Sequence, residues 1–371
     1  MKIKSFFILL LACALLFAGC KVETDAPDSP ASPAPSAAPT DFVLYRADSF
    51  RIGSQAYEKC SFNEDISKKY AALIGKAADA LAGETQVYCL VIPTAYGVLL
   101  PDDMKELIPD YSDMETNISS IYAALSESVE PVPVWDKLRE HSGEFIYFRT
   151  DPHWTARGAY LGYEAFCEAK GIAPIPLDAH RAVNFDGFLG TLYFENGCDE
   201  KLLPEETIEA FYPVSDGVTL TVTDADDNTT DCPIVADVSE LHALAKYRTF
   251  SGGNNPFSVV TNPNIKDDSV LILVKESFGN PLPAFLCDHY STIYIIDYRS
   301  WYGNIIDFAR EVHADDLLFA NNINAVNSGG NVGFIAMKIK RTNQNPLKCF
   351  ANELLTNCSQ FQGKTGLTLL H

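Results

Sequence analysis

Two short segments of the sequence carry side chains that could perform nucleophilic catalysis. In the first, the run from Thr150 to Thr155, Asp151 stands two residues before His153. A carboxylate at this spacing can hold one ring nitrogen of an imidazole and leave the other free to act as a base. Most Asp-x-His pairs make only a local structural hydrogen bond, so the spacing alone makes the two residues candidates.

The second segment, Lys275 to Asn280, follows an apolar run directly and places Ser277 where a strand would turn sharply into a helix. Pro281 suits the first position of that helix. The Ser277 hydroxyl would face the ligand side, where backbone N–H groups at a helix start could stabilise an oxyanion. The alternative is a helix cap, a role that Ser fills well. The Gly-x-Ser-x-Gly elbow of α/β-hydrolases is absent from the sequence.

The elements that must position these residues are clearest in the last third of the chain. Apolar runs at 270–274, 292–296 and 317–320 alternate with helical patterns at 281–286 and 305–312. This alternation predicts a parallel sheet with helical crossovers, and ligands of such sheets bind beyond the carboxyl ends of the strands. We therefore expect an α/β fold with its site in the loops after Val274, Ile296 and Ala320.

The rest of the body continues the α/β pattern and then changes in texture. Helices are expected over 66–81, stopped by Gly83, over 118–125, and over 156–169, capped by Thr155 and stopped by Gly171; strands are expected over 87–92 and 145–148. Residues 182–263 form a polar inserted region, in which alternation at 218–222 predicts a hairpin strand. The acidic run 224–231 lacks the Gly and the distal Glu of a calcium loop, so we interpret it as a solvated turn.

Composition and the N-terminus limit the class of protein. The chain has 371 residues and a net charge of −21, which disfavours nucleic-acid binding. Residues 1–20 have an early positive charge, an apolar run and Ala-Gly before Cys20, which is typical of a bacterial lipoprotein signal peptide with Cys20 as the lipidated residue. The alternative is an ordinary signal peptide. Residues 21–41, rich in Pro, Ala and Ser, predict an extended tether, and no later segment is long and apolar enough to span a membrane.

Cysteines and short motifs give no sign of a metal or a nucleotide. Cys198 with Cys232 and Cys349 with Cys358 are the candidate disulfides of an exported chain, whereas Cys89 and Cys167 lie in apolar runs and are expected to be buried thiols. The sequence has no CxxC pair, no His-Glu-x-x-His, no P-loop and no Rossmann glycine motif. We therefore expect neither a metal nor another cofactor.

Several segments, in their order and spacing, resemble the bacterial DHHW family across roughly residues 47–327. The matching segments are the Thr150–Thr155 run with Gly158-Ala159-Tyr160, Ile92-Pro93-Thr94, Gly187–Tyr193, Gly252-Gly253-Asn254, the Ser277 segment, Asp297-Tyr298-Arg299 and Asn321–Asn324. The family is similar to the SGNH-hydrolase-like proteins of alginate O-acetylation, in which Asp-x-His precedes the Ser in permuted order. The resemblance implies a permuted SGNH-like parallel sheet flanked by helices over residues 42–340.

The resemblance also implies roles for single residues. Ser277 would be the nucleophile, His153 the base and Asp151 the residue that orients it, with Pro152 standing where the family has its first His. Further candidates, each with a structural alternative, are Asn321, Asn322 and Asn254 as oxyanion donors or turn residues, Arg299 as a ligand of an anionic sugar or a loop anchor, and Tyr298 and Trp154 as sugar platforms or core residues.

The function that the sequence favours is a lipid-anchored O-acetyltransferase outside the cytoplasmic membrane. It would move an acetyl group through Ser277 to a cell-surface polysaccharide and work with a membrane-bound O-acyltransferase as partner. Two alternatives stay open. A carbohydrate esterase would use the same triad with water as acceptor, and a non-catalytic lipoprotein would only bind wall polysaccharide. Residues 341–371 have no functional interpretation.

Overall fold

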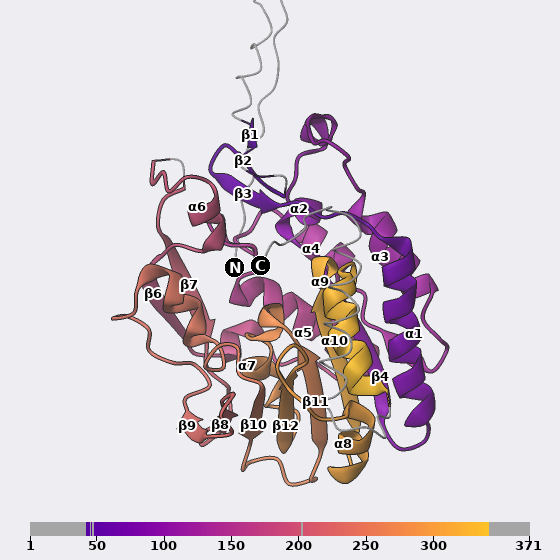
Figure 1. Ribbon diagram of the computed structural model, residues 1–371. Coiled ribbons are helices and arrows are strands. Elements are labelled where there is room, and N and C mark those ends of the chain that lie inside the picture. Colours follow the sequence, from indigo (N-terminus) through magenta and orange to yellow (C-terminus); the bar gives the residue numbers. More distant parts are fainter. Residues whose placement is uncertain (1–41, 45, 47, 202, 341–371) are drawn as a thin grey trace, which may run out of the picture. The chain divides into compact units, whose positions relative to one another are not determined.

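The computed structural model describes residues 42–340 apart from 45, 47 and 202 (Figure 1). The predicted lipidation site Cys20, the tether over 21–41, the pair Cys349–Cys358 and the tail 341–371 lie outside the described residues. Within the described part of the chain, no helix is long and apolar enough to cross a membrane.

One eight-stranded mixed sheet forms the centre of the domain, in the order β5-β4-β13-β11-β12-β10-β8-β9. Neighbours from β5 to β12 in this order are parallel, and β10, β8 and β9 continue the sheet in antiparallel pairing. The strands are β4 (Gln86–Ile92), β5 (Val129–Pro131), β8 (Thr219–Thr223), β9 (Thr229–Cys232), β10 (Phe257–Thr261), β11 (Val270–Lys275), β12 (Thr292–Asp297) and β13 (Asp316–Asn322).

The strands expected to be parallel are parallel, and the strand expected in a hairpin at 218–222 is β8, but the sheet as a whole is mixed. Three strands of the polar region extend the sheet instead of standing apart from it, and a short turn joins β8 to β9, which forces antiparallel pairing. Two smaller sheets complete the strands: β1 (Phe42–Leu44), β2 (Ser49–Ile52) and β3 (Gln55–Glu58) in one, β6 (Ala182–Phe188) and β7 (Glu206–Phe211) in the other.

Helices cover both faces of the parallel half. Successive side chains of β4 point to opposite faces, and all from Val87 to Ile92 are buried. The helix α1 packs with α8 and α10, while α5 packs with α7, and β4 contacts both α1 and α5 (Figure 1). The α-helices are α1 (Glu64–Ala80), α2 (Ala95–Val98), α3 (Met114–Ala123), α4 (Trp135–Glu140), α5 (Ala156–Lys170), α6 (Thr191–Glu195), α7 (Pro283–Leu286), α8 (Ile305–Glu311), α9 (Ile323–Val326) and α10 (Gly329–Ile339).

The helix α5 shows how local sequence sets an element's ends. Thr155 is its N-cap and accepts the N–H of Gly158, and Gly171 ends it with φ +76°, the left-handed conformation that Gly adopts without a steric penalty. Gly158 and Gly162 on its inner side let the helix approach Trp154, because a Cβ at Gly162 would lie 2.8 Å from the indole ring. Four 3-10 turns complete the helical elements: η1 (Asp102–Leu107), η2 (Leu177–Ala179), η3 (Ala243–Thr249) and η4 (Ser277–Gly279).

The strand expected over 145–148 is not formed. The chain makes only an isolated bridge between Tyr147 and Trp154 and folds back on itself between them. Phe148 N–H donates to the His153 carbonyl and Thr155 N–H to the Ile146 carbonyl, so the backbone is satisfied within the loop rather than by a neighbouring strand.

The cysteine predictions divide in the same way. Cys89 and Cys167 are buried, as predicted, but Cys198 and Cys232 are free thiols rather than a disulfide. Cys198 lies exposed after α6, while Cys232 ends the outermost strand of the main sheet. The acidic run 224–231 forms a turn, as expected. The Asp224 carboxylate accepts the N–H groups of Asp226 and Asn228, so it closes its own loop.

Candidate active site

Ser277 lies at the carboxyl edge of the sheet, two residues after β11 ends. Glu276 is the N-cap of η4, and its Oε2 accepts the Phe278 N–H at 2.9 Å. The turn after the strand is therefore a 3-10 turn, and α7 begins at Pro283, so the expected helix start at Pro281 is wrong. The N–H groups of Gly279 and Asn280 bond the carbonyls three residues earlier, at Glu276 and Ser277, so the chain completes a 3-10 turn before the helix begins.

The loop with the folded-back Tyr147–Trp154 bridge brings the two predicted motifs together. His153 Nε2 lies 2.7 Å from Ser277 Oγ, and His153 Nδ1 contacts Asp151 Oδ1. The three side chains thus form a continuous chain of hydrogen bonds, with the carboxylate on one ring nitrogen and the hydroxyl on the other. This is the arrangement in which a base can take the proton of a nucleophilic hydroxyl.

Asp151 is buried and held from several sides. Its Oδ1 accepts the His153 backbone N–H at 3.1 Å, and its Oδ2 accepts the Thr191 N–H at 3.0 Å. Burial alone would raise the pKa of Asp151, but the charge of His153 and these hydrogen bonds outweigh it and lower the pKa. Gly190 leaves room for the carboxylate, because a Cβ there would lie 2.2 Å from Asp151 Cβ. Asp151 is therefore held in its ionised form, the carboxylate.

A second buried carboxylate, that of Glu206, bonds the loop that carries Asp151 and His153. Glu206 on β7 accepts the backbone N–H groups of Arg149 and Thr150, each at 2.8 Å, and also the Thr150 hydroxyl. Thr150 Oγ1 in turn accepts the Gly190 N–H at 3.1 Å, which ties the loop to the start of α6. Burial raises the pKa of Glu206, although these hydrogen bonds oppose the rise.

Aromatic residues fix the imidazole and join the two motifs. The rings of Tyr247 and His153 stack with centroids 4.3 Å apart, and the Phe278 ring lies 4.6 Å from the imidazole. Tyr247 Oη donates to the Ser277 carbonyl at 3.1 Å. Trp154 Nε1 donates to the Phe278 carbonyl at 2.8 Å, so the residue after the histidine bonds the residue after the serine.

The Ser277–His153 pair opens into a cavity of about 340 Å³. Its described wall is rich in carboxylates and amides: Glu58, Glu276, Asn322, Asn324 and Asn331 line it together with Pro152, Phe278, Tyr298, Arg299 and Ala325. Burial raises the pKa of Glu58, while a hydrogen bond with Asn324 and the charge of His153 lower it in part. Among the described residues that line it, Arg299 is the one Arg or Lys.

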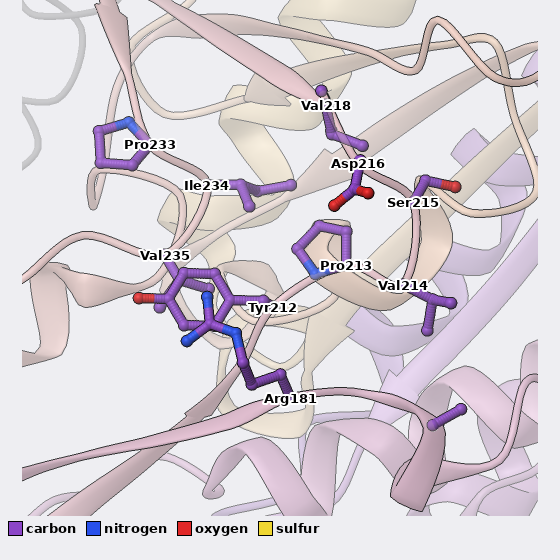
Figure 2. Close-up of a pocket in the computed structure, with 12 residues that line it drawn as sticks. Arg181, Tyr212, Pro213, Val214, Ser215, Asp216, Val218, Pro233, Ile234 and Val235 are labelled. Atoms are coloured by element: carbon purple, nitrogen blue, oxygen red, sulfur yellow. The ribbon is translucent and has the colours of Figure 1, made fainter.

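A pocket of about 360 Å³ elsewhere in the domain has a different character (Figure 2). The Arg181 guanidinium lies over the Tyr212 ring at 3.8 Å from its centroid, beside the segment 213–218. None of the site residues predicted from the sequence lines this pocket. We therefore do not take it as the candidate for catalysis, although it is about as large as the catalytic cavity.

The remaining predicted residues have clear places in the structure. Asn321 is fully buried and its Oδ1 accepts the Tyr70 hydroxyl at 3.0 Å. Asn322 caps α9 by accepting the Ala325 N–H, and its own N–H donates to Glu276 Oε1. Asn254 accepts the Asn280 amide at 3.1 Å. Of these three, Asn322 lines the cavity.

The structure also shows the roles of the other three predicted residues, Arg299, Tyr298 and Trp154. The Arg299 guanidinium makes two hydrogen bonds to Asp297, at 2.8 and 2.6 Å, so its charge is matched within the loop. Tyr298 and Trp154 have no exposed surface, and neither ring has a free face for a sugar. Their positions match the structural alternatives, the loop anchor and the core residues.

Sequence reasoning missed Glu58, Glu206, Thr191 and Tyr247. Thr191 lies inside a segment that resembles the family, so that segment carried a signal for it. The two carboxylates stand on strands distant in sequence, with no motif around them, and only the fold brings them to the loop. No group of His, Cys, Asp or Glu suited to a metal ion occurs among the residues that the structure describes.

Comparisons with known proteins agree with this architecture. A family model described as DHHW protein matches residues 27–296. A DHHW family protein from Eubacterium siraeum aligns at 24% identity over 81% of this chain and 99% of its own, with a TM-score of 0.72. PatB1 from Bacillus cereus, in a structure with a sulfonyl adduct, aligns at 15% identity over 81% of this chain and 100% of its own, with a TM-score of 0.64. At these identities the two structures show the fold alone, and a search of the curated proteins gave no match.

Proposed function

The chain belongs to the DHHW family, and from this premise we propose that it is a serine O-acetyltransferase acting on a cell-surface polysaccharide. The observation that carries the proposal is the hydrogen-bonded series Asp151–His153–Ser277, with 2.7 Å between His153 Nε2 and Ser277 Oγ in the wall of a cavity. The Asp-x-His element precedes the serine in the chain, as in a permuted SGNH-like fold, and we include that fold in the proposal.

The first half of the reaction forms an acyl-enzyme. Ser277 Oγ attacks the carbonyl carbon of an acetyl ester while its proton passes to His153 Nε2. Asp151, kept ionised by its lowered pKa, stabilises the imidazolium that results. The tetrahedral intermediate collapses, and the donor's oxygen leaves with the proton from His153. Ser277 then carries the acetyl group as an ester.

The second half transfers the acetyl group. A sugar hydroxyl enters the cavity and gives its proton to His153 as its oxygen attacks the acetyl carbonyl. Ser277 leaves with the proton from His153, and the sugar is acetylated. The Ser277 N–H, the first of η4, is our candidate for an oxyanion donor, because the first N–H groups of a helical turn have no acceptor within it. The Phe278 N–H is already taken by Glu276.

The place of the protein in the cell is part of the proposal and rests on the sequence. The signal-like residues 1–20 with Cys20 support a lipid anchor at the outer face of the cytoplasmic membrane, and the Pro-rich residues 21–41 support a tether. A membrane-bound O-acyltransferase partner would supply the acetyl group. Mass spectrometry of the N-terminal peptide from native membranes tests the anchor, since an unmodified Cys20 would contradict it.

Trapping the acyl-enzyme tests the catalytic proposal. The purified protein is treated with p-nitrophenyl acetate or with phenylmethanesulfonyl fluoride, which reacts with activated serine hydroxyls, and intact and peptide masses are read. We expect one adduct on Ser277 and none in Ser277→Ala. In His153→Ala, the rate of adduct formation should fall by at least about 10³-fold. A folded protein that gives no adduct would leave a glycan-binding role in its place. Acetyl release without transfer to any added glycan would make the protein an esterase.

A further inference from the structure

One loop contributes residues both to the catalytic cavity and to a further pocket, which is not the pocket of Figure 2. Tyr298 and Arg299 line the catalytic cavity, and the next four residues, Ser300 to Gly303, line a pocket of about 230 Å³. The far wall of the second pocket comes from Thr223 to Asp227, after β8, and from the start of β10. The two pockets are therefore neighbours along the chain of the loop.

The strand register places both pockets at the same edge of the sheet. Val274, Ile296, Phe257 and Thr223 form one row across β11, β12, β10 and β8. Ser277 lies beyond this row at β11, and the second pocket lies beyond it between β12 and β8. Three strand spacings separate β11 from β8, or roughly 14 Å at about 4.8 Å each. A short oligosaccharide can span that distance.

The second pocket offers the surface that the catalytic cavity lacks. Tyr302 is 74% exposed, the largest exposure of any large hydrophobic side chain among the described residues. Lys338 Nζ lies 5.1 Å from the centroid of the Tyr302 ring and occupies part of its surroundings, while Trp301 is anchored by edge contact with Phe308. The pocket therefore has a fixed indole next to a largely exposed phenol ring, which has the Lys338 ammonium over part of it.

Acidic side chains complete the lining. Asp224 and Asp227 line the pocket together with the aromatic pair, and no Lys or Arg is among the described residues that line it. Asp224 is engaged within its own loop, and the cation that contacts the Tyr302 ring is the Lys338 ammonium. Carboxylates accept hydrogen bonds from sugar hydroxyls, and aromatic rings present a large apolar surface at low entropic cost. The same carboxylates repel uronate or phosphate groups. In the catalytic cavity, Glu58 and Glu276 likewise add carboxyl groups rather than cations to the lining, and the charge of Arg299 is matched by Asp297.

From these observations we propose that the pocket of Trp301 and Tyr302 is a distal subsite for the acceptor glycan, and that this glycan is uncharged. The inference rests on the proposed transferase function and adds the acceptor class to it. A polymer lying along the sheet edge places one unit at Ser277 and another on Tyr302. The aromatic platform expected at Tyr298 is then provided four residues later.

Binding of defined oligosaccharides to the full chain, measured by calorimetry without an acetyl donor, tests the subsite. The neutral probes are cellohexaose and N-acetylchitohexaose, with their disaccharides as short probes and hexagalacturonate as the anionic one. We expect a neutral hexasaccharide to bind, and Tyr302→Ala to weaken that binding about three- to tenfold. Tyr302→Phe should restore it, and disaccharide binding should be the same in all variants. Tyr212→Ala, which removes the ring of the separate pocket, is the matched control.

Four outcomes would overturn the subsite: no binding of either neutral hexasaccharide, unchanged binding in Tyr302→Ala, equal weakening in Tyr212→Ala, or tighter binding of hexagalacturonate than of the neutral probes. Acylation of Ser277 by p-nitrophenyl acetate is measured on the same wild-type sample. Absence of acylation with Tyr302-dependent glycan binding would overturn the catalytic proposal and support the subsite, so the two failures are distinguishable.

Discussion

The serine and the histidine of the candidate site are held by different means. Ser277 follows a buried strand paired on both sides, and Glu276 closes its turn. His153 lies in a loop outside regular strands. The Glu206 side chain accepts backbone N–H groups of this loop, and the Thr191 backbone N–H donates to Asp151. The sheet thus positions the nucleophile, whereas buried polar contacts position the base. Acylation should therefore be more sensitive to polar and steric changes around the histidine loop than to changes behind the serine.

The largest effect is expected from Gly190→Ala. The new methyl would lie 2.2 Å from Asp151 Cβ and 2.4 Å from its Oδ2, so the carboxylate must leave the imidazole. Loss of that orientation should slow acylation of Ser277 by roughly 10²- to 10⁴-fold, measured by burst kinetics with p-nitrophenyl acetate. Gly143→Ala, where a methyl meets nothing within 4 Å, is the control and should acylate normally. Equal rates in the two variants would contradict the role of Gly190.

Glu206→Gln should have the next largest effect. The amide keeps the shape but offers one acceptor oxygen where two carboxylate oxygens accept three hydrogen bonds. We expect the free energy of unfolding to fall by about 1–3 kcal/mol and acylation to slow about tenfold. Glu209→Gln on the same strand breaks a partly exposed pair with Arg157 and should cost less than about 1 kcal/mol. Urea unfolding of both variants makes the comparison; similar losses would argue against a special support by Glu206.

The strand that carries Ser277 can be tested through Lys275, by measuring how the free energy of unfolding changes with pH. Burial lowers its pKa to about 8, with Asp297 opposing the shift. An unfolded chain keeps this proton up to about pH 10.4. Between these values the unfolded state binds more protons, so stability should rise with pH, by on the order of 1 kcal/mol per unit. Lys275→Met should lack this rise.

The measurement is urea unfolding of wild type and variant at pH 7.5, 8.5 and 9.5. Lys68→Met, which removes an exposed ion pair with Glu64, is the control and should follow the wild-type slope. If Lys275→Met also follows it, Lys275 does not lose its proton in this range.

The smallest effect is expected from Tyr247→Phe. The variant loses the hydrogen bond to the Ser277 carbonyl at 3.1 Å and keeps the ring against His153. We expect a loss of about 0.5–1.5 kcal/mol in stability and less than a tenfold change in acylation. Tyr247→Leu, which also removes the stacked ring, should slow acylation further. A Phe variant as slow as the Leu variant would mean that the hydroxyl, not the ring, holds the site.

The sequence predicted elements whose signals are local. Thr155 and Gly171 mark the ends of α5, and the apolar runs after residue 270 are β11, β12 and β13. The strand expected at 145–148 failed for a reason that lies elsewhere in the chain. The N–H groups that follow it, at Arg149 and Thr150, bond the Glu206 side chain from β7 instead of a strand. No pattern around residue 148 could reveal that partner.

The candidate site divides along the same line. Asp151 and His153 are two residues apart, so their contact is a local property of the sequence, while their distance to Ser277 depends on the whole sheet. The cavity wall needed still more of the fold, because Glu58 arrives from a separate three-stranded sheet. Residue types also misled where burial decides the role: Tyr298 and Trp154 are aromatic in the right segments but have no exposed surface.

The position of β13 also determines when a growing chain can acquire this site. It is the last strand of the described residues to be synthesised, yet it lies between β4 and β11. Before it is added, β4 and β11 are two unpaired edges, and unpaired edges promote aggregation. The Asn322 N–H that bonds Glu276 at 2.9 Å also arrives with this strand. A chain that ends before residue 316 therefore lacks the strand that joins the two parts of the parallel half. We expect the site to form only once β13 (Asp316–Asn322) has been synthesised.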